Sequence, residues 1–254
     1  MNDPSDRLSD VVITRNRLNK LERCLDSVKA KLPGAEVIVV DNGSTDGTAS
    51  FLKKQGDKLT IKLLEANAGV TVARNIGIRL ASRKCLLFLD DDAWIDRLPV
   101  EEIVSYLFGS QNIGIIAPRI LYPDSSLQES ARSFPTIMAL FWRGTKLYKL
   151  FPDVGWYRRY IDNDQSSIHP VDWAILACMV VKREMFERFG PLDEGYSLNY
   201  EDVEFCRRIK KGGCITVYWP DATVFHDYSR PSAKGINRQF FKHIASILRF
   251  YSKG

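Results

Sequence analysis

The first 90 residues of the chain alternate between short apolar runs and segments in which apolar residues recur every three or four positions. The runs are typical of buried strands, and the recurring spacing is typical of amphipathic helices. The predicted strands cover residues 10–14, 35–41, 59–64 and 85–90, and the predicted helices cover residues 18–32, 48–55 and 70–82. Because each strand is apolar on both faces, the pattern predicts an α/β fold with a Rossmann-like, mostly parallel sheet flanked by helices.

Polar residues gather directly after the four predicted strands, in loops at 14–17, 41–46, 65–69 and 90–92. The carboxyl ends of parallel strands lie at one edge of a sheet, and ligands of α/β proteins bind beyond that edge. We therefore expect the four loops to converge on one binding site.

The last of these loops places Asp90, Asp91 and Asp92 side by side. Three adjacent carboxylates repel one another, and this is tolerable where a divalent cation and a polyphosphate bind. Mg²⁺ and Mn²⁺ favour carboxylate oxygens and keep coordination positions open for phosphate oxygens. The alternative is a solvated acidic turn that caps the next helix.

Composition and motifs narrow the choice of function. The chain has 254 residues and is 45% hydrophobic, enough for one large domain with a buried core. It has no GxGxxG after the first strand and no GxxxxGK[ST], which argues against a dinucleotide oxidoreductase and a P-loop NTPase. Five cysteines without CxxC spacing favour buried thiols in a reducing cytoplasm over a zinc site. No apolar run approaches the roughly 20 residues of a membrane span, and no signal peptide is predicted.

A second acidic stretch begins a predicted helix near Glu201. Helical spacing puts Asp202 on the same stripe as Phe205 and Ile209, so Asp202 is expected to face inward, whereas Glu201 and Glu204 need not. A carboxylate at the head of an apolar stripe is well placed to line a cleft. The alternative is an acid favoured by the helix dipole, worth at most about 1 kcal/mol.

The positive charge of the chain lies at its end. The net charge is +5, and six lysines and arginines follow Asp227 with no acid among them, so the residues before them sum to about −1. A basic amphipathic helix is predicted there, and contact with an anionic membrane surface is expected through residues 234–253. The alternative is a helix that caps the domain and leaves its lysines in water. The chain has no nucleic-acid-reading motif, so no nucleic-acid partner is expected.

The order of several motifs resembles a known family. The stretches VVITRNR, VIVVDNGSTDGT, NAGVTVARNIGI and LLFLDDDA are similar to the nucleotide-binding half of a family 2 glycosyltransferase with the GT-A fold. In that family the acidic triplet is the DXD-type metal motif. The later stretches VDWAILACMVV, NYEDVEFCRR and VYWPDATVFHDYS resemble the branch that contains rhamnosyltransferases and galactofuranosyltransferases. The likeness spans roughly residues 9–229.

The resemblance assigns roles to individual residues. It implies a nucleotide site that includes Thr14, Arg15, Asp41, Asn67, Arg74, Asp90 and Asp91. It also implies that Asp92 and His226 hold Mg²⁺ or Mn²⁺, and that Asp202 is the catalytic base. Trp173 and Glu201 are expected on the acceptor or sugar side. The alternatives are an Asx turn for Asp41, a surface cation for Arg74, a strand-end histidine for His226 and a core side chain for Trp173.

The function expected from this resemblance is metal-dependent, inverting sugar transfer in surface polysaccharide biosynthesis. We expect a nucleotide-sugar donor, first dTDP-rhamnose and second a UDP-sugar, and a saccharide or lipid-linked acceptor at the inner face of the cell membrane. A non-catalytic subunit that binds nucleotide-sugar would need Asp41 and Asp92 but not Asp202, and a nucleotidyltransferase is a third candidate. Many relatives carry glycine where this chain has Leu176, so the sugar pocket is expected to differ.

The predicted organisation is a single GT-A domain over residues 1–254. Its nucleotide-binding half covers 9–97, a smaller mixed acceptor-side half covers 98–229, and the basic amphipathic helix covers 230–254.

Overall fold

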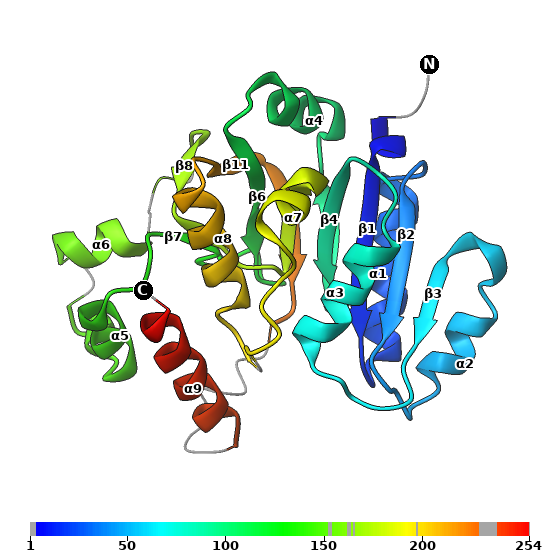
Figure 1. The fold of residues 1–254 in the computed structure, drawn as a ribbon, viewed down its shortest axis with the longest axis horizontal. Coiled ribbons are helices and arrows are strands. Elements are labelled where there is room, and N and C mark those ends of the chain that lie inside the picture. Colours follow the sequence, from blue (N-terminus) through cyan, green and yellow to red (C-terminus); the bar gives the residue numbers. More distant parts are fainter. Residues whose placement is uncertain are drawn as a thin grey trace.

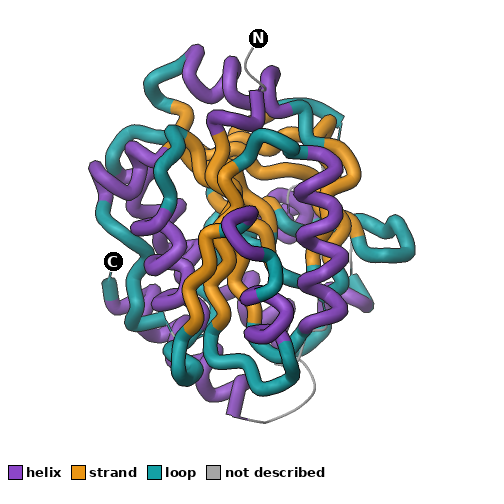
Figure 2. The backbone as a smooth tube through the Cα atoms, turned by 90° about the vertical axis from the view of Figure 1, so that its right-hand side faces the viewer, coloured by secondary structure: helices purple, strands orange, loops and turns teal. Residues whose placement is uncertain are grey.

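A computed structural model describes residues 4–151, 154–161, 164, 166–196, 198–228 and 238–253. Its centre is a nine-stranded mixed sheet with helices on both faces (Figures 1 and 2). A small antiparallel sheet lies apart from it and pairs β7 (Ala131–Arg132) with β9 (Trp173–Ala174). The expected α/β class with a mostly parallel sheet and a smaller mixed half is confirmed.

The first half of the chain forms the parallel part of the sheet in the strand order β3-β2-β1-β4. The strands are β1 (Leu8–Thr14), β2 (Glu36–Asp41), β3 (Thr60–Leu63) and β4 (Cys85–Asp90). The helices between them are α1 (Leu18–Lys31), α2 (Thr48–Lys53) and α3 (Val70–Leu80). The ends of these strands and helices lie within two residues of the predicted ends, because the periodicity of apolar residues is strong in this part of the chain.

The second half mixes strand directions. Its strands in the large sheet are β5 (Ala93–Arg97), β6 (Ile113–Leu121), β8 (His169–Val171), β10 (Cys178–Lys182) and β11 (Ile215–His226). Its helices are α4 (Val100–Gly109), α5 (Ile137–Gly144), α6 (Gly155–Ile161), α7 (Arg183–Phe189), α8 (Glu201–Lys211) and α9 (Arg238–Ser252). The described residues also form the short 3₁₀ helices η1 (Pro4–Arg7), η2 (Gly56–Lys58) and η3 (Leu147–Lys149). Antiparallel β10 joins the two halves by pairing with both β4 and β6.

Two apolar layers hold the helices against the sheet. Alternate residues of a strand point to opposite faces, so Val11 packs on one side with α3, α7 and α8, while Val12 packs on the other with α1, α2 and α4. Leu86 and Leu87 repeat this division in β4. The sheet is therefore buried on both faces, and its strand ends are the positions where polar side chains gather.

Pairing of β5 with β11 brings the two ends of the functional region together. Ala93 lies opposite His226, and the amide of Asp227 donates to the carbonyl of Asp92 at 2.9 Å. Since β5 starts directly after the three aspartates, this register places His226 beside them. Residues more than 130 positions apart thus meet at one strand end.

The C-terminal helix is present as α9. Its predicted start lies outside the described residues, as do Arg230, Lys234 and Ile236. Within the described part of the chain, none of the helices combines the length and apolar character that crossing a bilayer requires.

Helix α3 packs so closely on β1 that a side chain added at Gly77 should destabilise the fold. A Cβ added at Gly77 would collide with Cγ1 of Val11, a stiff branched side chain in the core. We expect Gly77→Ala to lower the free energy of unfolding by about 1–3 kcal/mol, measured by urea denaturation. Gly109→Ala at the end of α4 is the control, since that position has open space and should be neutral or gain up to about 1 kcal/mol. Equal stability of the two variants would contradict the tight contact.

Candidate active site

The three aspartates lie where β4 ends and the chain turns into β5. Asp91 and Asp92 are buried, and Asp90 is partly exposed. Thr14, the last residue of β1, donates its hydroxyl to Asp91 Oδ2 at 2.8 Å. The triplet is therefore held within the fold, and the alternative of a solvated acidic turn is wrong.

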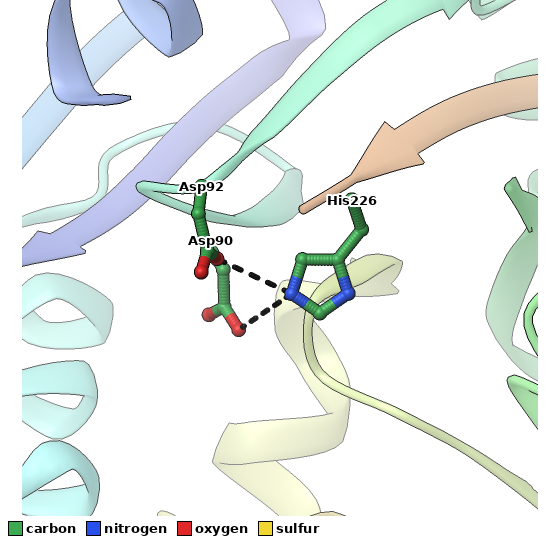
Figure 3. A group of neighbouring side chains, drawn as sticks. All are labelled: Asp90, Asp92 and His226. Carbon is green, nitrogen blue, oxygen red and sulfur yellow. Dashed lines mark ion pairs between the residues drawn. The ribbon is translucent and has the colours of Figure 1, made fainter. Parts of the chain in front are cut away.

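Asp90, Asp92 and His226 form a compact group of oxygen and nitrogen donors (Figure 3). His226 Nε2 lies 3.2 Å from Asp92 Oδ1 and 4.0 Å from Asp90 Oδ2. One donor atom from each residue falls within 4.8 Å of the other two. Two carboxylates and an imidazole at this spacing suit a divalent cation such as Mn²⁺ or Mg²⁺.

The orientation of His226 fits a metal ligand. Its Nδ1 lies 2.7 Å from Gln128 Oε1, so a proton on Nδ1 is satisfied there. The buried Nε2 faces the carboxylates: in the neutral ring it offers a lone pair to an ion, and in the protonated ring it meets Asp92 as a cation. The ring of Tyr228 stacks on the imidazole at a centroid distance of 5.3 Å. A second hydrogen bond that fixes the ring in this way is common around metal-binding histidines.

Arg17 and Lys20 supply cations to the aspartates. Arg17 Nη1 lies 3.0 Å from Asp91 Oδ1 and 2.8 Å from Asp92 Oδ2, and Lys20 Nζ lies 3.6 Å from the same Asp92 oxygen. Burial acts to raise the pKa of Asp92, but His226 and Arg17 outweigh it and keep that pKa below its ordinary value. For Asp91 burial prevails and raises the pKa to about 6.

Arg74 joins the aspartates to the second half of the protein. This buried guanidinium, on α3, donates to Asp90 Oδ1 at 2.8 Å and to Glu201 Oε1 at 2.7 Å. It is thus no surface cation, and the alternative considered from sequence is wrong. The contact also explains why Glu201 is buried although its place on the helix did not require it. Glu204 is buried by its ion pair with Arg208.

Asp202 follows Glu201 at the start of α8. Its carboxylate accepts a hydrogen bond from the backbone amide of Val203 at 2.8 Å. Burial, reinforced by the negative charge of Glu201, raises the pKa of Asp202 to about 7. A carboxyl group with this pKa is suited to exchange protons near neutral pH.

The loops after β2 and β3 lie at the same edge of the sheet as the three aspartates. Asp41 is buried and accepts a hydrogen bond from the Ser44 amide at 3.0 Å, and Asn42 donates to Asn67 Oδ1 at 3.2 Å. Gly43 has a φ of +75°, and a Cβ there would come within 2.6 Å of the Ala66 backbone. The Asp41–Ser44 bond gives Asp41 a role in turn structure.

The comparisons with known proteins agree with this geometry. Residues 9–189 match the family model described as Glycosyl transferase family 2, which is well over half of the chain. The chain belongs to glycosyl transferase family 2. It is therefore a glycosyltransferase, and the alternatives of a non-catalytic subunit and a nucleotidyltransferase are set aside.

Two relatives of this family 2 glycosyltransferase carry rhamnosyl transfer in their names. The N-acetylglucosaminyl-diphospho-decaprenol L-rhamnosyltransferase of Mycobacterium tuberculosis is 29% identical over 243 residues, covering 87% of this chain and 76% of the relative. The dTDP-rhamnosyl transferase RfbF of Shigella flexneri is 25% identical over 233 residues, covering 89% and 72%. The solved structure of GalNAc-T7 with UDP, GalNAc and Mn²⁺ is 16% identical with a TM-score of 0.66, and covers 95% of this chain but 48% of that one. This last likeness shows a shared GT-A fold.

The structure brings most of the predicted residues of the family 2 site together and separates others from it. Arg15 is exposed and makes no ion pair or hydrogen bond with the three aspartates, whereas Arg17, two residues later, contacts two of them. The Trp173 ring is buried, and its Nε1 donates to the Ser133 carbonyl at 2.8 Å, as expected of a core side chain. The Leu176 side chain also packs in the core.

Sequence reasoning missed Arg17 and Gln128 as members of the site. Arg17 had a weak signal, because it lies in the polar loop after the first strand. Gln128 precedes the short strand β7 and meets His226 only after the whole sheet has formed, so its position carried no signal.

Competition between Arg17 and a metal ion is testable. Removing the guanidinium takes a positive charge away from Asp91 and Asp92, so Arg17→Ala should bind Mn²⁺ about three- to tenfold more tightly without nucleotide. Calorimetric titration with MnCl₂ measures this. Arg15→Ala, with the same loss of charge, should change the affinity less than about twofold. Weaker Mn²⁺ binding by Arg17→Ala would mean that Arg17 orients the carboxylates for the ion.

Proposed function

We propose that this glycosyltransferase moves a deoxyhexose, first of all rhamnose from dTDP-rhamnose, to a lipid-linked saccharide with inversion at the anomeric carbon. A UDP-sugar is the second choice of donor. The proposal rests above all on one observation, the continuous chain of contacts from Asp92 and His226 through Asp90, Arg74 and Glu201 to the helix that carries Asp202. It supports the proposal because it connects the candidate metal ligands to the candidate base.

The donor side would be held by the first half of the protein. Asp92, His226 and Asp90 would ligate Mn²⁺ or Mg²⁺, whose charge, when the ion is bound, offsets the charge that develops on the leaving diphosphate. Arg74 adds a permanent cation with five N–H donors close to Asp90. Thr14, Asp41 and Asn67 would position the nucleotide from the loops at the same sheet edge.

The acceptor side would be served by Asp202. In an inverting transfer, one carboxylate removes the proton from the acceptor hydroxyl while its oxygen attacks the anomeric carbon. The bond between that carbon and the diphosphate oxygen breaks in the same step, and the proton ends on Asp202. The backbone amide of Val203 would hold the carboxylate in one orientation for this transfer.

The names of the relatives support the choice of substrates. One relative is named for transfer of L-rhamnose to a diphospho-decaprenol-linked sugar, and another for dTDP-rhamnose. A lipid-linked acceptor would place the protein peripherally at the inner face of the cell membrane, in surface polysaccharide biosynthesis.

Replacement of the base tests the proposal. Asp202→Asn keeps the size of the side chain but cannot take a proton, so we expect kcat to fall about 10²- to 10⁴-fold while dTDP binding is retained. Release of dTDP or UDP from a panel of nucleotide-sugars, in the presence of a lipid-linked GlcNAc acceptor, measures transfer. Glu204→Gln on the same helix is the control and should keep kcat, because Glu204 is paired with Arg208. Undiminished transfer by Asp202→Asn would overturn the assignment.

The raised pKa of Asp202 predicts a pH dependence. Only the deprotonated carboxylate acts as a base, so kcat/KM should fall about tenfold per pH unit below pH 7. Because the folded protein holds this proton more tightly than the unfolded chain, stability should fall as the pH rises from about 4 to 7. Thermal denaturation should therefore show Asp202→Asn to be more stable than the wild type at pH 8, with a difference that shrinks toward pH 4. A pH-independent rate between pH 5 and 8 would contradict this.

A further inference from the structure

Among the described residues, the large apolar side chains that are most exposed are confined to two segments. Among the described residues, seven large apolar side chains are more than half exposed, at 55% to 75%. They are Ile137, Met138, Phe141, Leu150, Phe151, Phe241 and Leu248. All lie in residues 137–151, which include α5 and η3, or in α9. Single exposed apolar residues are ordinary on a protein surface, but such a concentration marks an interaction site.

The two segments adjoin each other. Tyr251, in the last turn of α9, donates its hydroxyl to the carbonyl of Pro135 at 2.6 Å, two residues before α5 begins. Figure 1 shows α9 beside α5 at the same side of the molecule. We call residues 137–151 and 238–253 together the apolar–basic surface.

Helix α9 has two apolar sides, which explains how it serves both the core and this surface. Phe250 is buried, and Ile247 packs against the same core cluster. Phe241, Ile244 and Leu248 follow one another at helical spacing and are exposed. The sequence pattern did not separate these two sides, because both are rich in aliphatic and aromatic residues.

The charge on the apolar–basic surface has one sign. Residues 137–151 and 238–253 contain no Asp or Glu. Arg249 and Lys253 pair with Asp193, and Arg143 pairs with Glu129. For Lys146, Lys149 and Lys242 the described part of the chain provides no acidic partner within salt-bridge distance.

We propose that the apolar–basic surface docks on an anionic lipid bilayer, with its aromatic and aliphatic side chains in the interface and its lysines among the headgroups. Exposed apolar side chains beside unpaired lysines are the features that such interfacial binding uses. A second copy of this chain fits the surface less well, since a symmetric dimer sets identical patches face to face and would bring lysines against lysines.

The surface also adjoins the site. Ser246 of α9 donates to the Leu198 carbonyl at 2.8 Å, and the rings of Phe250 and Tyr200 lie 5.4 Å apart. Tyr200 immediately precedes α8, which begins with Glu201 and Asp202. Docking would hold Asp202 near the headgroup region, where a lipid-linked acceptor carries its sugar. This last step rests on the proposed function, but the docking itself does not.

Vesicle co-sedimentation tests the docking independently of catalysis. The probes are vesicles of phosphatidylcholine alone and of phosphatidylcholine with phosphatidylglycerol at about 3:1. The wild-type protein should bind the anionic vesicles at low salt, bind the neutral ones at least tenfold more weakly, and lose affinity as salt is added. Phe141→Ser combined with Leu248→Ser should lower the affinity for anionic vesicles at least tenfold. Lys146→Gln combined with Lys242→Gln should weaken it and flatten its salt dependence.

Leu80→Ser combined with Phe108→Ser is the matched control, because these apolar side chains are exposed outside the surface. This variant should bind as the wild type does, and circular dichroism should show that every variant is folded. Absence of wild-type binding at low salt, or equal loss in the control, would overturn the proposal. So would a wild-type dimer in analytical ultracentrifugation that dissociates in Phe141→Ser with Leu248→Ser. Transfer to a short, water-soluble acceptor should be unchanged in all these variants, so failed docking and failed transfer are separable.

Discussion

The structure depends on the accommodation of three adjacent negative charges at the end of β4. Residues Asp90–Asp92 are tolerated because a guanidinium, a hydroxyl or an imidazole reaches each of them from a different element. Arg74 comes from α3, Thr14 from β1, Arg17 from the loop after β1 and His226 from the end of β11. Repulsion between the carboxylates would disfavour such a turn in isolation, but it is offset by attractive contacts with side chains from these four segments. Donor atoms remain at cation-binding distance.

Arg74 connects this cluster to the second half of the protein. One of its amino groups contacts Asp90, on the proposed nucleotide side, and the other contacts Glu201, next to Asp202 on the proposed acceptor side. The charge of Glu201 is thereby neutralised on one side, yet it still helps to raise the pKa of Asp202. In the proposed mechanism, Arg74 would therefore link donor binding to the protonation of Asp202.

Much of this arrangement could be predicted from the sequence, since it follows from periodicity. The alternation of strands and helices up to Asp90 put the aspartates at the sheet edge, and helical spacing pointed Asp202 inward. Gln128 could not be predicted, because it meets His226 across 98 positions. Arg17 could not be distinguished from Arg15, because Asn16 between them adopts a φ of +53° and redirects the chain in a way that no pattern signals.

In the proposed function, the aspartates and His226 form a metal-dependent site for a nucleoside diphosphate. Calorimetric titration of the purified protein with dTDP, UDP, GDP and CDP, each with and without Mn²⁺, tests it most directly. We expect that one pyrimidine diphosphate, dTDP first, binds at least tenfold more tightly with Mn²⁺, and that His226→Ala abolishes this gain. Binding that is equal with and without Mn²⁺, or no binding of any of the four, would contradict it.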